Sequence, residues 1–117
     1  MAKEVNNYIR ITLPRSMMNH LGVQDAVKEL TAYVGGVSRT ESVGEWFDGE
    51  GARWFDVNYI MQWNFGAPQF PRADMLARRV VDALHKAGEQ AVFRERDFNV
   101  NGKSKGYRAR IIYPTKN

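Results

Sequence analysis

The segment from Trp54 to Phe65 constrains the fold most, because an apolar residue occupies every second position from Phe55 to Phe65. One side carries Phe55, Val57, Tyr59, Met61, Trp63 and Phe65, and the other is polar apart from Trp54 and Ile60. A period of two is typical of a β-strand that is packed on one face and wet on the other. At about 3.3 Å per residue the strand would reach roughly 40 Å, so we expect its hairpin to project beyond the core.

Two amphipathic helices are predicted on either side of this strand. Residues 24–34 carry one apolar stripe and end at Gly35-Gly36, and residues 72–87 carry another and end at Gly88. The first stripe consists of Ala26, Val27, Leu30, Tyr33 and Val34, and the second of Ala73, Leu76, Val80, Ala83, Leu84 and Ala87. A helix with a single apolar stripe can cover one face of a sheet.

Further strands are predicted at residues 8–13, 37–47, 91–98 and 107–113, with a polar loop at 99–106. The order is therefore β-α-β-β-α-β-β in a single domain of residues 1–117. We predict an α+β fold, a ferredoxin-like βαββαβ sandwich with one additional C-terminal strand, whose antiparallel sheet carries two helices on one face. In the last strand, we expect Tyr107, Ala109, Ile111 and Tyr113 to form the inward face.

Composition excludes several kinds of site. The chain has 117 residues, of which 44% are hydrophobic and 26% charged, and it contains no cysteine. Disulfides and thiolate metal sites are thereby excluded. His20 and His85 lie far apart in the sequence and no nucleophile–base pair is evident, so we expect no catalytic residues, no metal and no cofactor. Neither a signal peptide nor a membrane-spanning run is evident, and we expect a cytoplasmic protein without a membrane partner.

A short pattern of glycines and one tryptophan suggests an origin. Gly35-Gly36-Val37-Ser38 is followed by Gly44-Glu45-Trp46 and a long strand. This resembles a group of small uncharacterised α/β proteins from phage and mobile-element genomes, over about residues 27–98. The resemblance implies a phage or mobile-element origin. It implies no activity and no site residues.

Charge is distributed unevenly along the chain, whose formal net charge is +4. Residues 90–117 contain only Glu95 and Asp97 as acids, whereas residues 37–56 are acidic overall. The basic residues of the C-terminal hairpin that we single out as a candidate anion-binding set are Arg94, Arg96, Lys103, Lys105, Arg108 and Arg110. If the strands pair in the matching register, the four arginines share one patch, and guanidinium groups bind phosphate bidentately. The alternative is a solvated face on which the arginines splay apart.

The tryptophans divide between core and surface. Trp63 lies on the apolar face of the long strand and is predicted to be buried. Trp54 falls on the mostly polar face beside the turn at residues 48–51, and we expect Trp46 and Trp54 to form a partner interface.

These features lead us to expect a non-enzymatic, phage-encoded binding protein. Its partner would be an anionic ligand, a nucleic acid or a nucleotide-like molecule, held by the basic C-terminal hairpin. The alternative is a protein–protein inhibitor or adaptor, for example one that blocks a host or defence protein. That function would use the central hairpin, its tryptophans and the acidic stretch. Edge pairing of the long strand would produce a homodimer.

Overall fold

The computed structural model describes residues 4–100 and 103–115. Their elements follow the predicted order, with two short 3₁₀ helices added. The bounds are β1 (Asn7–Pro14), η1 (Arg15–Asn19), α1 (Leu21–Val34), β2 (Ser38–Phe47), β3 (Arg53–Phe65), η2 (Ala67–Gln69), α2 (Phe70–Lys86), β4 (Val92–Val100) and β5 (Lys103–Ile112). Among the described residues no helix is long and apolar enough to cross a membrane.

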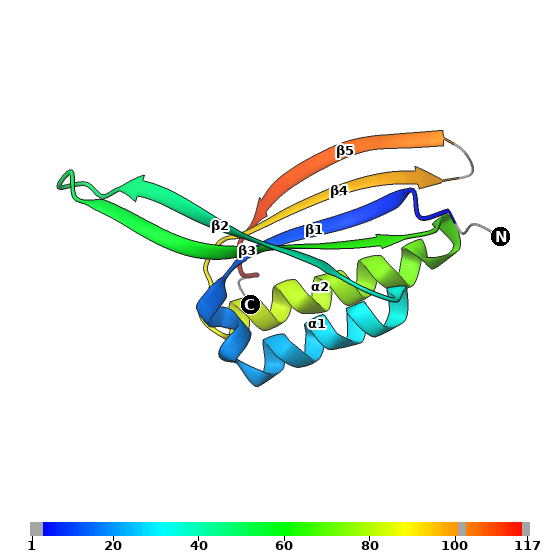
Figure 1. Ribbon diagram of the computed structural model, residues 1–117, viewed down its shortest axis with the longest axis horizontal. Helices are drawn as coiled ribbons and strands as arrows, with labels where there is room; N and C mark the ends of the chain where they lie inside the picture. Colours follow the sequence, from blue (N-terminus) through cyan, green and yellow to red (C-terminus); the bar gives the residue numbers. More distant parts are fainter. Residues whose placement is uncertain (1–3, 101–102, 116–117) are drawn as a thin grey trace.

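The five strands form one sheet in the order β2-β3-β1-β4-β5, and each neighbouring pair is antiparallel. Helices α1 and α2 lie side by side on one face of this sheet, and the other face is open (Figure 1). The predicted α+β class is confirmed in this form. The long strand β3 is hydrogen-bonded to β2 on one side and to β1 on the other, so it is not an edge. Edge pairing through β3, from which we expected a homodimer, is therefore wrong, and the sheet edges are β2 and β5.

The core fills the space between the sheet and the helices. Ile9, Ile11 and Leu13 of β1 lie in it, as do Met61 and Trp63 of β3. The predicted burial of Trp63 is confirmed, and its indole N–H donates to the Thr31 hydroxyl of α1 over 2.9 Å. From the helices come Val23, Val27, Leu30, Val34, Ala73, Leu76, Ala77, Val80, Val81 and Leu84. Burial of these stripes fixes both helices against the sheet.

The β2–β3 hairpin extends beyond the helices, as the length of the alternating segment predicted (Figure 1). Near its tip the apolar side chains are solvated, since Val43, Phe47 and Phe55 are all more than half exposed. The face of β3 that packs on the helices at Met61 and Trp63 thus continues toward the hairpin tip, where no helix covers it. This leaves an aromatic wall beside the end of β1.

The C-terminal strands differ from the prediction in two respects. Described residues 99, 100 and 103–106 lie in strands instead of a loop, and residues 101 and 102 are outside the described part. In addition, Tyr107, Ala109, Ile111 and Tyr113 do not face the core, and all four are exposed. Val92 and Phe98 of β4 are buried on the helix side, so the antiparallel register directs Arg108, Arg110 and Ile112 of β5 to that side.

Candidate functional site

A cleft opens where the projecting hairpin passes η1, and we call it the hairpin cleft. Pro14 ends β1 with an extended backbone, and η1 then turns the chain across the base of the hairpin. The volume of the cleft is about 790 Å³, within the range of small-molecule sites. It is lined by Pro14, Arg15, Ser16, Met18, Asn19, Arg39, Phe55, Asp56, Val57, Tyr59 and Glu89.

One wall of the hairpin cleft is aromatic. It consists of Phe55 and Tyr59, which lie on the same side of β3 because of the strand's period of two. The Arg39 guanidinium lies over the Tyr59 ring at 4.5 Å from the centroid. A planar base or a cation could be held against such a wall by stacking or by cation–π attraction.

Two acidic residues also line the cleft, Asp56 on β3 and Glu89 after α2. Asp56 alternates with Phe55 and Val57, so its side chain leaves β3 on the face opposite the aromatic wall. Asp56 accepts a hydrogen bond of 2.9 Å from the indole N–H of Trp46, which orients it. Burial raises the pKa of Glu89, and the negative charge of Asp56 raises it further, against an opposing effect of His85. A carboxyl group with a raised pKa in a cleft is a typical candidate for acid–base or electrostatic catalysis.

The hairpin cleft therefore combines both signs of charge with an apolar wall. Arg15 and Arg39 supply the positive groups, and Arg15 also contacts the Glu41 carboxylate at 3.5 Å. A ligand that carries a cation, a carboxylate and a planar ring would find a partner for each group here. Sequence reasoning missed this site, because η1, the hairpin and the segment after α2 are far apart along the chain. The only signal was the acidic character of residues 37–56.

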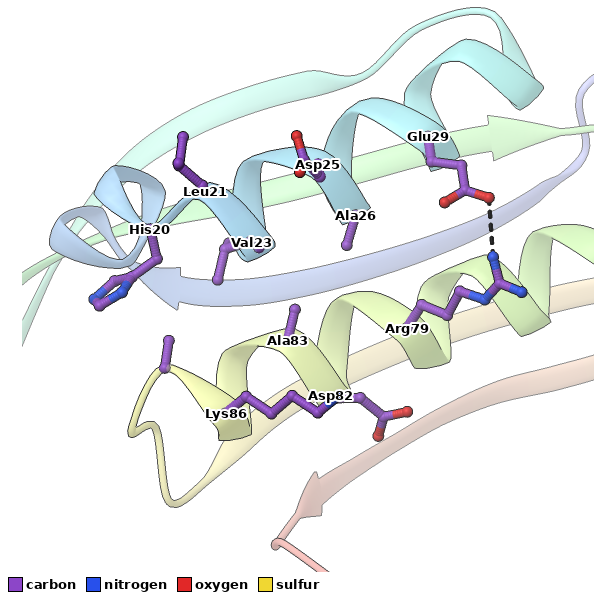
Figure 2. A pocket seen from close by; sticks show the side chains of 12 residues that line it. His20, Leu21, Val23, Asp25, Ala26, Glu29, Arg79, Asp82, Ala83 and Lys86 are labelled. Carbon is purple, nitrogen blue, oxygen red and sulfur yellow. Dashed lines mark hydrogen bonds and ion pairs between the residues drawn. The ribbon is translucent and has the colours of Figure 1, made fainter.

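Figure 2 shows a second hollow, a groove of about 520 Å³ between α1 and α2. It contains Asp25, Glu29 and Asp82, and Arg79 bridges to Glu29 over 3.0 Å. His20, for which the sequence indicated no catalytic partner, lies at one end of this groove (Figure 2). The groove has no phenylalanine, tyrosine or tryptophan among its lining residues, so it lacks the aromatic wall that distinguishes the hairpin cleft.

The arginines of the C-terminal hairpin are paired across the strands, in the register on which the predicted shared patch depended. The register sets Arg94 opposite Arg110 and Arg96 opposite Arg108. Arg94, Arg96 and Arg110 line a cavity of about 460 Å³ beside α2, to which Arg78 also contributes. Arg108, Lys103 and Lys105 are exposed and do not line this cavity.

Sequence reasoning missed Arg78 and its partner Asp74. Asp74 is buried, and its carboxylate forms ion pairs with Arg78 at 3.1 Å and with Arg96 at 3.4 Å. Their spacing of four residues on α2 was the available signal, since such residues are neighbours on a helix. Ligand binding by the predicted anion-binding set stays a prediction.

Trp46 and Trp54 are register partners near the tip of the central hairpin, with stacked rings 5.8 Å apart. Each indole N–H is already engaged, that of Trp46 by Asp56 and that of Trp54 by Asp48, both at 2.9 Å. The Trp54 hydrogen bond is the main cause of a lowered pKa at Asp48. The pair therefore organises the hairpin itself, and its predicted role as a partner interface is untested.

Comparison with known proteins bears on the fold and on the class of function. No protein-family model and no curated protein matches the sequence. The similar solved structures include a phage SAM lyase in complex with S-methyl-5′-thioadenosine and a phage SAM lyase in the apo state. The match to the first structure covers 97% of this chain and 94% of the SAM lyase chain, and the match to the second covers 100% and 98%. Both are 11% identical to this chain, with a TM-score of 0.54.

These neighbours agree in part with the expected resemblance to phage proteins, and they correct the expected function. We expected a non-enzymatic binding protein, with an inhibitor or adaptor as the alternative. The solved structures that share the fold belong to an enzyme, so both of those expectations are wrong, and the chain has the fold of a phage SAM lyase.

Proposed function

We propose that this chain is an enzyme that cleaves S-adenosylmethionine as a lyase and releases S-methyl-5′-thioadenosine from the hairpin cleft. The observation that carries the proposal is the pattern of aromatic, acidic and basic side chains in this cleft. The cleft belongs to a fold shared over nearly its full length with a SAM lyase. S-methyl-5′-thioadenosine is the compound named with one of those structures.

The finer description of the fold is part of this proposal. We infer a ferredoxin-like βαββαβ unit in a single domain, with β5 added at one edge. The strand order β2-β3-β1-β4 within the sheet supports this inference. The phage source of both solved neighbours supports a phage origin for the chain.

The groups of S-adenosylmethionine match those of the hairpin cleft. Its sulfonium and ammonium groups are positive and would lie near Glu89, whose carboxylate attracts them, and the negative charge of Asp56 adds to this attraction at longer range. Its carboxylate would pair with Arg15 or Arg39. The adenine ring would stack on Phe55 and Tyr59. By contrast, the arginine-lined cavity beside α2 would repel a substrate with two cationic groups.

The reaction follows from the two molecules involved. S-methyl-5′-thioadenosine keeps the methyl and adenosyl groups, so the bond that breaks joins sulfur to the γ-carbon of the amino-acid fragment. The bonding electron pair moves to sulfur, which becomes a neutral thioether. Because charge disappears from sulfur, contact with the apolar aromatic wall favours the transition state over the charged substrate.

The amino-acid fragment can leave in either of two balanced ways. Glu89 can accept a proton from the β-carbon, so that the fragment leaves as an alkene. Alternatively, the fragment's own carboxylate can bond to the γ-carbon and close a ring without proton transfer. In the first way Glu89 is a base, and in the second its negative charge orients the substrate through the ammonium group.

The test is to incubate the purified protein with S-adenosylmethionine and measure products by chromatography with mass spectrometry. We expect one S-methyl-5′-thioadenosine for each substrate consumed, and the companion product identifies the way in which the fragment leaves. Glu89→Gln should lower kcat/KM by about 10²-fold. Glu29→Gln, in the groove between the helices, should leave it unchanged.

Two results would contradict the proposal. One is a folded protein that forms no S-methyl-5′-thioadenosine over the range of about pH 5 to pH 9. The other is formation of S-adenosylhomocysteine instead, which would indicate methyl transfer. Circular dichroism of each variant establishes that loss of activity is not loss of fold.

A further inference from the structure

One cavity beside α2 has no part in the proposed reaction, and we call it the arginine cavity. It lies between β4, β5 and α2, on the helix side of the sheet, and has a volume of about 460 Å³. Four guanidinium groups line it, those of Arg78, Arg94, Arg96 and Arg110. None of these residues lines the hairpin cleft.

Arg94 is the residue that distinguishes this cavity from an ordinary basic surface. Only 5% of Arg94 is exposed, and its Nε is buried without a hydrogen-bond partner. Burial lowers the pKa of Arg94 and the neighbouring charge of Arg96 lowers it further, against an opposing effect of Asp74. A buried guanidinium without an ion-pair partner is strongly destabilising, so an anionic ligand that pairs with it would be bound at this position.

The carboxylates nearby do not neutralise the cavity. Asp74 is shared between Arg78 and Arg96, at 3.1 Å and 3.4 Å. Asp82 lines the cavity but is exposed, and none of the ion pairs among the described residues involves Arg94. Four arginines beside two carboxylates leave two positive charges in excess. The register also holds Arg94 opposite Arg110, and two like charges in direct cross-strand contact repel unless an anion lies between them.

The excess charge and the donor geometry select the ligand class. Guanidinium is a planar donor that pairs bidentately with tetrahedral oxyanions, and a phosphate group at neutral pH carries close to two negative charges. We propose that the arginine cavity is a phosphate-binding site, in which Arg94 and Arg110 hold the oxyanion between β4 and β5. The site is separate from the hairpin cleft and does not rest on the proposed lyase function.

The experiment measures thermal unfolding of the full chain in inorganic phosphate against sodium chloride of equal ionic strength. The melting temperature of the wild-type protein should rise with phosphate concentration, by on the order of 10 °C at a hundredfold excess over Kd. Arg94→Met should abolish this shift. Without phosphate, this variant should melt at or above the wild-type temperature, because it lacks the unpaired buried charge.

Arg108→Met is the matched control, because Arg108 is the exposed partner of Arg96 and does not line the cavity. It should keep the phosphate shift. Arg110→Met alters an exposed side chain and should weaken phosphate binding at least about tenfold without unfolding, should Arg94→Met fail to fold. Glycerol 3-phosphate, with glycerol as control, distinguishes free phosphate from a phosphate ester. An ester is the ligand if it binds more tightly than inorganic phosphate while glycerol does not bind.

Three outcomes would overturn the proposal. The first is a wild-type protein whose melting temperature is the same in phosphate and chloride. The second is a phosphate shift that survives in both Arg94→Met and Arg110→Met. The third is displacement of phosphate by S-adenosylmethionine, since the two ligands would then share one site. Lyase activity is measured in phosphate-free buffer, so its failure is distinguishable from failure of phosphate binding.

Discussion

At the scale of single residues, Glu89 combines exposure to a cleft with an environment that disfavours its charge. Burial and the charge of Asp56 raise its pKa, so the folded protein holds this proton more tightly than the unfolded chain does. Its contribution to stability is therefore present at low pH and is lost as the pH rises through the pKa in the folded state. A carboxyl group that lowers the stability of the folded protein when it ionises is typical of a functional site.

We therefore expect Glu89→Gln to be more stable than the wild type at about pH 7, and this advantage to shrink toward about pH 4. Urea unfolding of both proteins over that range measures it. Wild-type kcat/KM should rise with pH through the same ionisation, because both ways of releasing the fragment require the carboxylate. A stability difference that stays constant with pH would show that the pKa of Glu89 does not differ between the folded and the unfolded state.

At the scale of elements, the central hairpin connects the predicted strand pattern to the site. The alternation of residues 54–65 was sufficient to predict strand β3 and its projection. The cleft was not predictable in the same way, because Glu89 reaches it only through the packing of α2 against the sheet. Likewise, alternation put each arginine pair on one face, but the side that β5 turns inward depends on the buried Val92 and Phe98 of β4. Hydropathy along β5 alone predicted that Tyr107 and Tyr113 lie on the inward face.

The two stacked tryptophans of this hairpin have different hydrogen-bond partners, and this allows a matched comparison. Trp46 donates to Asp56, a residue that also lines the hairpin cleft, whereas Trp54 donates to Asp48 in the turn. Phenylalanine preserves stacking and removes only the N–H. Trp46→Phe should therefore lower kcat/KM for S-adenosylmethionine by about tenfold, from the loss of one hydrogen bond to a charged group.

Trp54→Phe should leave kcat/KM within about twofold of the wild type, and steady-state kinetics of the two variants measures the difference. Equal losses in both would mean that the hairpin acts through its overall rigidity. In that case the orientation of Asp56 would not be the reason for the effect.

At the scale of the whole molecule, the sheet separates charge. The acidic stretch lies on the β2–β3 side, with Glu41, Glu45, Asp48 and Glu50 around the hairpin. The basic strands β4 and β5 lie at the opposite side of the sheet. The hairpin cleft is therefore at the acidic end of a protein that is positive overall, and the arginine cavity is at the basic end. This arrangement would attract ligands of opposite charge to different ends of the molecule.

S-adenosylmethionine carries one net positive charge at neutral pH, so the field at the acidic end should accelerate its binding. We expect kcat/KM to fall by about twofold to tenfold between roughly 0.01 M and 0.5 M salt, while kcat stays constant. Glu50→Lys, in the turn and outside the cleft lining, should lower kcat/KM at low salt and converge with the wild type at high salt. Lys105→Glu, on β5 at the opposite edge, is the matched control and should cause no loss. If Glu50→Lys differed equally at every salt concentration, the effect would come from local contacts and the long-range field would not contribute.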